Sequence, residues 1–277
     1  MLAALHPKRI LTVLDEIDNQ SPSYSLTRSE SLRRTLATLA CVCVCLLLIH
    51  YAKLYSSMTL TFEWFSQSLG QTKSYWLLRL QATQFLPLIS YVWWTLWHVV
   101  GYVLIPFVLI KFVFKTPFLG MGWRFNDTFH HWRGYLLLLM PILLFVFLVS
   151  QGPDFVHHYP FYQHAGRSWF DFLAWEFLYL LQFVCLEFFF RGFMLNALRP
   201  AMGANAVWVM CVPYLMIHFP KLWLEASGAI LFGLFLGILA LRSRSIWGGV
   251  CVHAGIAVSM DVAALIQKNA IPTQLWP

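Results

Sequence analysis

The sequence predicts an all-α protein, a polytopic transmembrane helical bundle of about seven to eight helices. Of its 277 residues, 59% are hydrophobic and only 11% are charged, whereas soluble proteins carry about 25% charged residues. The mean hydropathy is +0.64. Apolar runs of about 20 residues, enough to cross ~30 Å of hydrocarbon, recur along the chain. We therefore expect an integral, multi-pass membrane protein.

The basic residues fit membrane topology better than nucleic-acid binding. The formal net charge is +7, but the lysines and arginines are spread through the loops between apolar runs and form no single stripe. Their excess on the side of the amino terminus predicts that this terminus faces the cytosol and the carboxyl terminus the outside. No nucleic-acid partner is expected.

Residues 1–35 are expected to form a polar cytosolic N-terminal arm, because they carry several charges and lack the apolar core of a signal peptide. Residues 36–277 are expected to form the transmembrane bundle. The first span is predicted at 36–55, the first apolar run of sufficient length. Residues 56–81 mix polar and aromatic residues, which favours an interfacial segment over an eighth, half-length span. The next span, 85–114, is apolar and rich in tryptophan.

Five further spans are predicted in the second half of the chain, where apolar runs alternate with polar connections. They cover residues 134–150, 169–198, 205–219, 225–241 and 246–267. No internal repeat and no low-complexity linker is visible, so a single membrane domain is expected.

The segment 169–198 carries polar residues that a lipid-facing helix should lack. A charged side chain at the bilayer centre costs at least ~2.5–3.5 kcal/mol, so such residues face protein or water. Glu187 and Arg191 are four residues apart, share a helix face and can pair. Glu176 lies about three turns earlier on nearly the same face. The segment is therefore either part of a functional site or the carrier of a structural ion pair between helices.

Two histidines and an aspartate lie within the later spans. A lone histidine on an apolar helix is more often structural than functional. However, a tight turn near residue 201 would place His218 within about one helical turn of Glu187. His253 enters the membrane from the same side, and Asp261, two turns beyond it, can orient a side chain or accept a hydrogen bond. One carboxylate and two imidazoles are therefore expected to converge in the inner half of the bilayer.

These groups suit the activation of water. A carboxylate can accept a proton from water, and a neutral imidazole can polarise a carbonyl group or bind a metal ion. A set of Glu187, His218 and His253 would also serve a divalent metal such as zinc, but the HExxH pattern is absent and nothing requires a metal or another cofactor. In a transporter the same residues would form a proton relay. Spacing alone leaves these alternatives open.

Three sequence segments resemble the motifs of a known family. They read LEFFFRGF at 186–193, YLMIHF at 214–219 and HAGIAVSMD at 253–261. Together they are similar to the motifs of the CAAX protease and bacteriocin-processing family of intramembrane endopeptidases, which includes the type II CAAX prenyl proteases. The resemblance covers about residues 168–267, which we expect to be the catalytic core. It implies a helical bundle with a water-filled cavity and cleavage of substrates near the membrane surface.

The resemblance assigns roles residue by residue. Glu187 and Arg191 match the second glutamate and the arginine of the family's EExxxR motif. His218 matches the histidine of FxxxH, with Tyr214 in place of the phenylalanine. His253 matches the histidine of the third motif. The family is described as glutamic-type or metal-dependent, so the resemblance implies a catalytic role for these residues under either mechanism.

Two positions depart from the family pattern. Leu186 stands where the first glutamate of the pair usually stands, and that glutamate is commonly given the role of water-activating base. Ala257 stands where the family often has asparagine. Glu187 is the first choice for the base in this chain, and Glu225 and Glu176 are the reserves. Glu225 begins the helix after His218, although a helix-start charge stabilised by the helix dipole explains it equally well.

The sequence therefore predicts an intramembrane endopeptidase that cleaves a peptide bond of a membrane-associated protein or peptide by glutamate- and histidine-activated water. Its expected partners are the lipid bilayer and a membrane-anchored protein or peptide substrate. As the resemblance extends to bacterial members, a bacterial inner (plasma) membrane is the expected location. A non-catalytic scaffold or immunity-type protein that keeps the family bundle is the alternative. A proton-coupled transporter fits less well, because no internal symmetry is visible.

Overall fold

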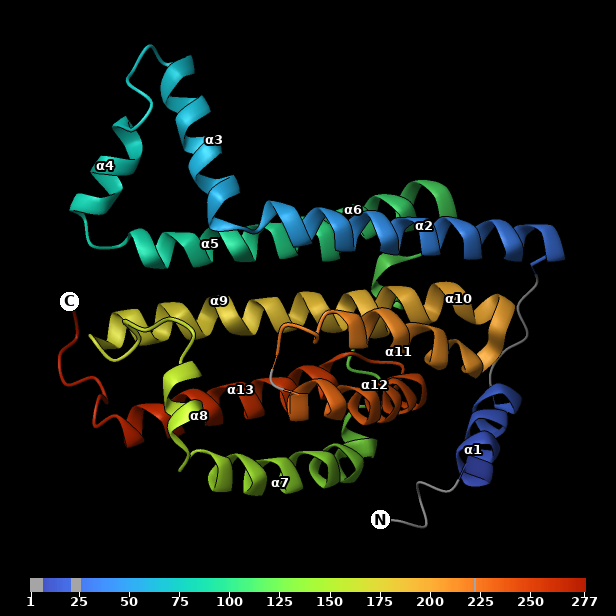
Figure 1. Ribbon diagram of the computed structural model, residues 1–277. Helices are drawn as coiled ribbons and strands as arrows, with labels where there is room; N and C mark the ends of the chain where they lie inside the picture. The colour runs from blue at the N-terminus through green and yellow to red at the C-terminus, as the bar shows by residue number, and fades with distance from the viewer. Residues whose placement is uncertain (1–6, 21–25, 222) are drawn as a thin grey trace. The chain divides into compact units, whose positions relative to one another are not determined.

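The computed structural model describes residues 7–20, 26–221 and 223–277 (Figure 1). These residues form helices joined by short connections, and no strand occurs among them. The predicted all-α class is confirmed.

The first half of the chain contains two long helical stretches and several short helices. Its elements are α1 (Pro7–Asn19), α2 (Arg28–Ala52), α3 (Tyr55–Ser68), α4 (Tyr75–Ala82), α5 (Leu86–Val99), the π-helical η2 (Val100–Leu104), α6 (Ile105–Val108), the π-helical η3 (Leu109–Phe114) and the 3₁₀ turns η4 (Phe118–Gly120) and η5 (Phe129–His131).

The second half contains the helices that carry the motif residues. Its elements are α7 (Trp132–Val149), α8 (Pro153–His158), α9 (Trp169–Glu187), the π-helical η6 (Phe188–Met194), α10 (Leu195–Met202), the 3₁₀ turn η7 (Gly203–Asn205), α11 (Ala206–Met216), α12 (Trp223–Ser243) and α13 (Trp247–Gln267).

Six stretches of the described chain are long and apolar enough to cross a membrane. They are Arg28–Ala52, Leu86–Phe114, Phe129–Val149, Trp169–Met216, Glu225–Ser243 and Trp247–Gln267. The protein is therefore an integral, multi-pass membrane protein by length and composition.

The difference from the seven expected spans arises at 205–219. That segment contains α11, whose 11 residues are about 16 Å long and too short to cross the hydrocarbon alone. The candidate span Trp169–Met216 contains both α11 and the span expected at 169–198. Two expected spans therefore correspond to one candidate span.

The polar and aromatic segment 56–81 forms two short helices, α3 and α4, which diverge from α5 (Figure 1). With 14 and 8 residues, neither is among the candidate spans. Leu60 and Trp64 on α3 are mostly exposed. These features agree with the predicted interfacial segment and not with an eighth span.

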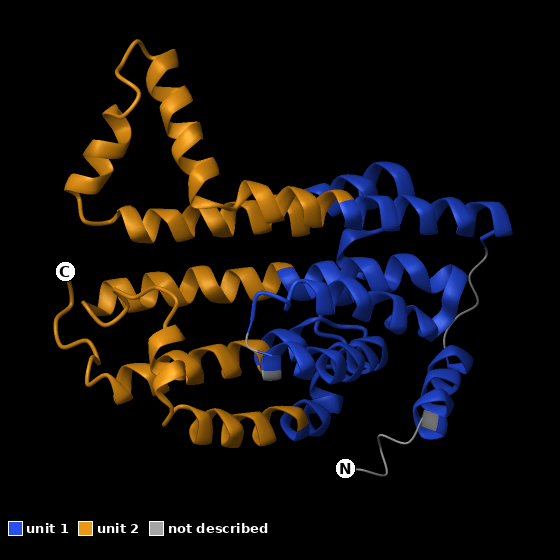
Figure 2. Ribbon diagram, in the orientation of Figure 1, with its two compact units in different colours: residues 1–43, 105–137, 186–251 blue, residues 44–104, 138–185, 252–277 orange. Residues whose placement is uncertain are grey.

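The chain divides into two compact units (Figure 2). The first draws on the residues up to Cys43, on Ile105–Leu137 and on Leu186–Cys251. The second consists of Val44–Leu104, Leu138–Cys185 and Val252–Pro277. The unit boundaries fall inside α9 and inside α13, so the residues singled out from the sequence are distributed over both units.

In the first unit, part of the predicted polar arm is a docked amphipathic helix. On α1, Ile10, Leu14 and Ile17 are buried, and their spacing of four and three residues places them on one helix face. The Asp18 carboxylate at the end of α1 accepts the backbone N–H of Ala204 at 2.8 and 2.9 Å. The arm thus contributes to the packing of this unit.

Gly203 makes the turn into α11 possible. Its φ of 59° lies in the region that favours glycine, and a Cβ atom here would collide with the Asp18 carboxylate. The turn reverses the chain after α10, so that α11 returns toward the residues at the end of α9.

In the second unit, a hydrogen-bond network fixes the start of α9. Ser168 Oγ accepts the backbone N–H of Asp171 at 3.1 Å, as an N-cap does. The Asp171 carboxylate accepts hydrogen bonds from Ser168, Tyr162 and Arg167, each at 2.7 or 2.8 Å. The orientation of α9 is therefore set from its first turn.

Candidate functional site

The motif glutamate and arginine form a fully buried ion pair in the first unit. Glu187 ends α9, and its Oε1 lies 3.0 Å from Nη1 of Arg191. Their side chains are 1% and 0% exposed. Arg191 lies in η6, a π-helical turn, and such turns often occur at functional sites. The pairing expected from the sequence is present.

Tyr214 connects this ion pair to α11. The guanidinium carbon of Arg191 lies 4.0 Å from the centre of the Tyr214 ring, a cation–π contact that gains strength when desolvated. The tyrosine that replaces the family's phenylalanine therefore contacts the motif arginine with its ring.

His218 follows α11 and continues this series of contacts. Its Nδ1 lies 2.7 Å from the backbone oxygen of Tyr214, and its ring centre lies 4.6 Å from that of Tyr214. Because a carbonyl oxygen only accepts hydrogen bonds, Nδ1 carries the hydrogen and Nε2 is the basic nitrogen. The imidazole is half-buried, so it is held in place without being sealed from its surroundings.

One continuous series of contacts thus links four residues, Glu187, Arg191, Tyr214 and His218. We call this series the Glu187–His218 chain. It joins the end of α9 and η6 to α11 through the turn at Gly203–Asn205. The sequence predicted that a turn near residue 201 would bring Glu187 and His218 to a similar depth, and the observed turn lies two residues later.

Glycines at the start of α13 make room for Glu187. A Cβ atom at Gly249 would collide with Oε2 of Glu187, and one at Gly248 would collide with the ring of Tyr135. Tyr135 is in turn hydrogen-bonded to Ser243 at 2.9 Å. Sequence reasoning missed this packing, although the Gly-Gly pair was a visible signal for close approach.

Glycines on α12 position Tyr214. A Cβ atom at Gly233 would come within 3.0 Å of Cys211 Sγ and 3.1 Å of the Tyr214 ring. Small residues let two membrane helices approach closely. The close packing of α11 on α12 therefore helps to fix the position of Tyr214.

Glu225, the reserve base, belongs to a partly exposed ion pair. It is in the first turn of α12 and pairs with Lys221 at 3.2 Å. The two side chains are 32% and 26% exposed. The surface ion pair agrees with the alternative of a helix-start charge.

In the second unit, His253 of α13 stacks on Phe183 of α9. Their ring centres are 5.2 Å apart and their planes differ by 10°. This parallel stacking orients the imidazole. The imidazole remains half-buried.

Asp261 and Glu176 are also in the second unit and are both buried. Asp261 Oδ2 accepts a hydrogen bond from Trp175 Nε1 at 2.6 Å. Asp261 therefore accepts a hydrogen bond, as the sequence suggested, but from a tryptophan of α9.

The structure brings the predicted site residues together in two groups. Glu187, Arg191, Tyr214 and His218 belong to the first unit, and His253, Glu176 and Asp261 to the second. That the two imidazoles and the glutamate meet in one chamber stays a prediction.

In the described part of the chain, no group of three or more His, Cys, Asp or Glu side chains lies so that it could hold a metal ion. Oε1 of Glu187 is paired with Arg191. The chemistry proposed below uses the chain's own carboxylate and imidazoles.

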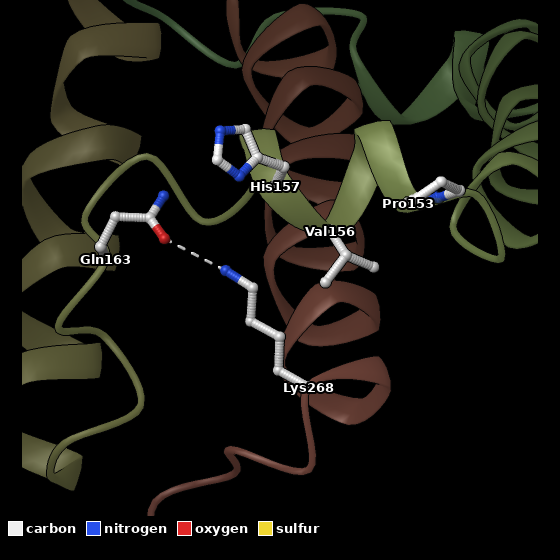
Figure 3. A pocket seen from close by; sticks show the side chains of 5 residues that line it. All are labelled: Pro153, Val156, His157, Gln163 and Lys268. Atoms are coloured by element: carbon white, nitrogen blue, oxygen red, sulfur yellow. Dashed lines mark hydrogen bonds between the residues drawn. The ribbon is translucent and has the colours of Figure 1, made fainter.

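A surface pocket of about 500 Å³ lies in the second unit and contains none of the motif residues (Figure 3). Lys268 donates a hydrogen bond to Oε1 of Gln163 across it, at 3.2 Å. Partial burial lowers the pKa of Lys268, and the charge of Asp261 opposes this shift. The rest of the lining comes from Pro153, Val156 and His157.

Comparison with known proteins gives one match. Residues 168–259 match the family model described as type II CAAX prenyl endopeptidase Rce1-like. No curated protein and no solved structure matches the chain. The matched residues contain the Glu187–His218 chain and His253. Residues 168–259 are thus similar to the Rce1-like type II CAAX prenyl endopeptidases, a family of proteases.

Proposed function

We propose that this protein is an intramembrane endopeptidase that cleaves a peptide bond of a membrane-associated protein or peptide near the bilayer surface. The main support is the Glu187–His218 chain, in which a buried carboxylate and a half-buried imidazole are held by Arg191 and Tyr214. The match of residues 168–259 to a family of proteases supports the same reaction class. We further propose a bacterial inner membrane as its location.

In the proposed reaction, Glu187 and His218 activate water. The Glu187 carboxylate, held by Arg191 through Oε1, accepts a hydrogen bond from water. The water proton passes to the base, and the hydroxide attacks the carbonyl carbon. The base then returns the proton to the leaving amine as the C–N bond breaks.

Nε2 of His218 is the proton acceptor that the geometry favours. Its Nδ1 is bound to the Tyr214 carbonyl, which fixes the tautomer with a basic Nε2. Leu186 occupies the position of the family's usual base and offers no proton acceptor. In this mechanism Arg191 and Tyr214 hold the two reacting groups and do not exchange protons.

His253 is proposed to stabilise the oxyanion of the tetrahedral intermediate. The support for this role is that His253 matches the histidine of the family's third motif and lies within the residues that match the family model. Ala257 lacks the donor that the family often provides one turn further on.

The role of Glu187 in activating water is tested by substituting the two glutamates separately. The full-length chain is reconstituted in proteoliposomes and given a panel of fluorogenic peptides, prenylated and unprenylated, because the matched family is described as CAAX prenyl endopeptidases. We expect Glu187→Gln to lower cleavage by about 10²–10⁴-fold, the range for loss of a group that takes part in acid–base catalysis, and Glu225→Gln to change it less than about threefold. The opposite pattern would assign the role of Glu187 to Glu225.

One observation favours a second candidate, a non-catalytic scaffold or immunity-type protein. Leu186 is buried at 4% exposure where the family's first glutamate usually stands. If the wild-type chain cleaves no peptide of the panel but Leu186→Glu does, the scaffold is the correct assignment.

A further inference from the structure

The surface pocket of the second unit has no part in the mechanism above (Figure 3). Its volume of about 500 Å³ lies within the range of about 300–1,000 Å³ that ligand pockets have. Its lining combines three polar side chains with two apolar ones: Lys268, His157 and Gln163, and Pro153 and Val156. No acidic side chain is among these five described residues. The lining therefore suits a ligand that has both a negative charge and apolar parts.

The cation of the pocket is held by the neighbouring amide. Lys268 Nζ donates to Oε1 of Gln163 at 3.2 Å, and Nε2 of Gln163 donates to the carbonyl oxygen of Pro160 at 2.7 Å. Gln163 thus ties the ammonium group to the loop before α9. An ammonium group has three N–H donors, and Gln163 is the one acceptor bonded to it within the described residues. Two donors therefore remain for a ligand.

His157 adds a further donor. Its imidazole is exposed and forms no hydrogen bond within the described part of the chain. Even a neutral imidazole carries one N–H group. Figure 3 shows the His157 ring and the Lys268 ammonium group on the side of the pocket toward Gln163. A phosphate group matches these donors, because it offers several oxygen acceptors and lysine binds it as a point charge.

The pocket lies at the level where two candidate spans end. The span that contains α7 ends at Val149, and the span of α13 ends at Gln267, next to Lys268. The two ends lie side by side, because α7, α8 and α13 share a buried cluster that includes Val146, Phe155 and Ala264. Residues just beyond the ends of membrane spans lie at the level of the lipid headgroups. The pocket is therefore placed to bind a headgroup.

Exposed apolar side chains cover the last turns of α7 before the pocket. Leu144, Phe147 and Leu148 are between 61% and 65% exposed, and their spacing places them on one helix face. Only 11% of the apolar window of this span is buried, the smallest share among the candidate spans. Lipid tails are as apolar as leucine and can cover this face. A phosphate carried by a lipid therefore fits the site better than a free phosphate ester does.

We propose that the pocket binds the phosphate group of an anionic phospholipid, with Lys268 and His157 as donors and the acyl chains on the exposed face of α7. The same donors can bind a free phosphate ester, so the test below separates the two sources. The inference is independent of the proposed cleavage reaction.

Photoactivatable lipids test the proposal on the full-length chain in phosphatidylcholine vesicles. The probes are phosphatidic acid and phosphatidylcholine with the same photoactivatable acyl chain, and mass spectrometry of peptides measures the labelling of α7 and α8. We expect stronger labelling by phosphatidic acid. Lys268→Gln should lower it about fivefold, the effect of one lysine near an anionic headgroup, whereas Lys268→Arg keeps the charge and should retain it. Equal labelling of the wild type by both lipids would overturn the proposal.

Lys73→Gln is the matched control, because it removes one positive charge at an exposed position between α3 and α4 of the same unit. It should be labelled like the wild type. The same loss of labelling in Lys73→Gln and Lys268→Gln would reveal a general effect of charge and contradict a specific site.

Val156→Phe fills the pocket without changing its charge. It should also lower labelling by phosphatidic acid, with thermal unfolding as the check that the variant is folded. Unchanged labelling of the folded variant would show that the lipid does not enter the pocket. If this variant does not fold, the two Lys268 variants decide the proposal.

Glycerol 3-phosphate separates the two sources of phosphate. This soluble ester has no acyl chains, so an amount equal to that of the phosphatidic acid should leave the labelling unchanged. Loss of the labelling under these conditions would assign the pocket to a free phosphate ester and overturn the assignment to a lipid.

Discussion

At the scale of single residues, the candidate site depends on small residues as much as on charged ones. Glu187 fits beside α13 only because residue 249 has no side chain. The arginine that pairs with it lies over an aromatic ring, and that ring in turn contacts the histidine. Each residue of the Glu187–His218 chain therefore restricts the position of the next. We expect the cleavage rate to respond to substitutions that remove no charged group.

Gly249→Ala tests the space around Glu187. The added methyl group would collide with Oε2, so the carboxylate must move. We expect cleavage to fall by about 10–100-fold, since small displacements of reacting groups cost this much. Gly228→Ala on α12 is the matched control, because a Cβ atom there meets nothing within 4 Å. Equal cleavage rates for the two variants would show that the position of Glu187 is unimportant.

Tyr214 allows the ring and the hydroxyl group to be separated. Tyr214→Phe keeps the cation–π contact with Arg191 and should lower the cleavage rate less than about threefold. Tyr214→Leu loses it, and with it about 0.5–2 kcal/mol of interaction at a buried site. The leucine variant should therefore be clearly less stable in thermal unfolding and less active. Equal stability of the two variants would argue against a role for the cation–π contact.

At the scale of elements, irregular helix geometry and a docked helix complete the first unit. The π-helical η6 carries Arg191, and its wider turn sets where this side chain leaves the helix. The amphipathic α1 packs through its buried apolar face and binds the turn before α11 through Asp18. The path of the backbone into α11, and therefore the position of Tyr214, depends on both η6 and α1.

Asp18→Ala should weaken the docking of α1 and leave the chemistry unchanged. The variant loses a carboxylate that accepts the N–H of Ala204, and hydrogen bonds to charged groups contribute about 1.5–3 kcal/mol. Thermal unfolding should therefore occur at a lower temperature than in the wild type. Asp15→Ala, at an exposed position of the same helix, should unfold like the wild type. If both variants unfold alike, Asp18 does not hold α1 in place.

At the scale of the whole molecule, composition and long apolar runs were sufficient to predict the fold class. The runs at 85–114 and 246–267 became Leu86–Phe114 and Trp247–Gln267 almost unchanged, because a membrane span is set by length and hydropathy. The span expected at 205–219 became a shorter helix, since its length follows from the turn at Gly203 and from packing on α12. The docking of α1 was missed because its partner, Ala204, is distant in sequence.

The site was predictable where residues interact along one helix or within one motif. The Glu187–Arg191 pair follows from a spacing of four residues. The contact of Arg191 with Tyr214 and the space at Gly249 depend on the packing of separate helices, which periodicity does not encode. For the same reason Asp261 was placed on the face of His253, while its partner Trp175 could not be identified.

The central claim is that the Glu187–His218 chain activates water for peptide cleavage. The most direct test compares the wild-type chain with His218→Ala in proteoliposomes, using a prenylated peptide with a fluorogenic cleavage site. We predict that the wild type cleaves it and that the variant, folded by the criterion of thermal unfolding, is at least about 100-fold slower. Cleavage at the wild-type rate by the folded His218→Ala variant would contradict the account.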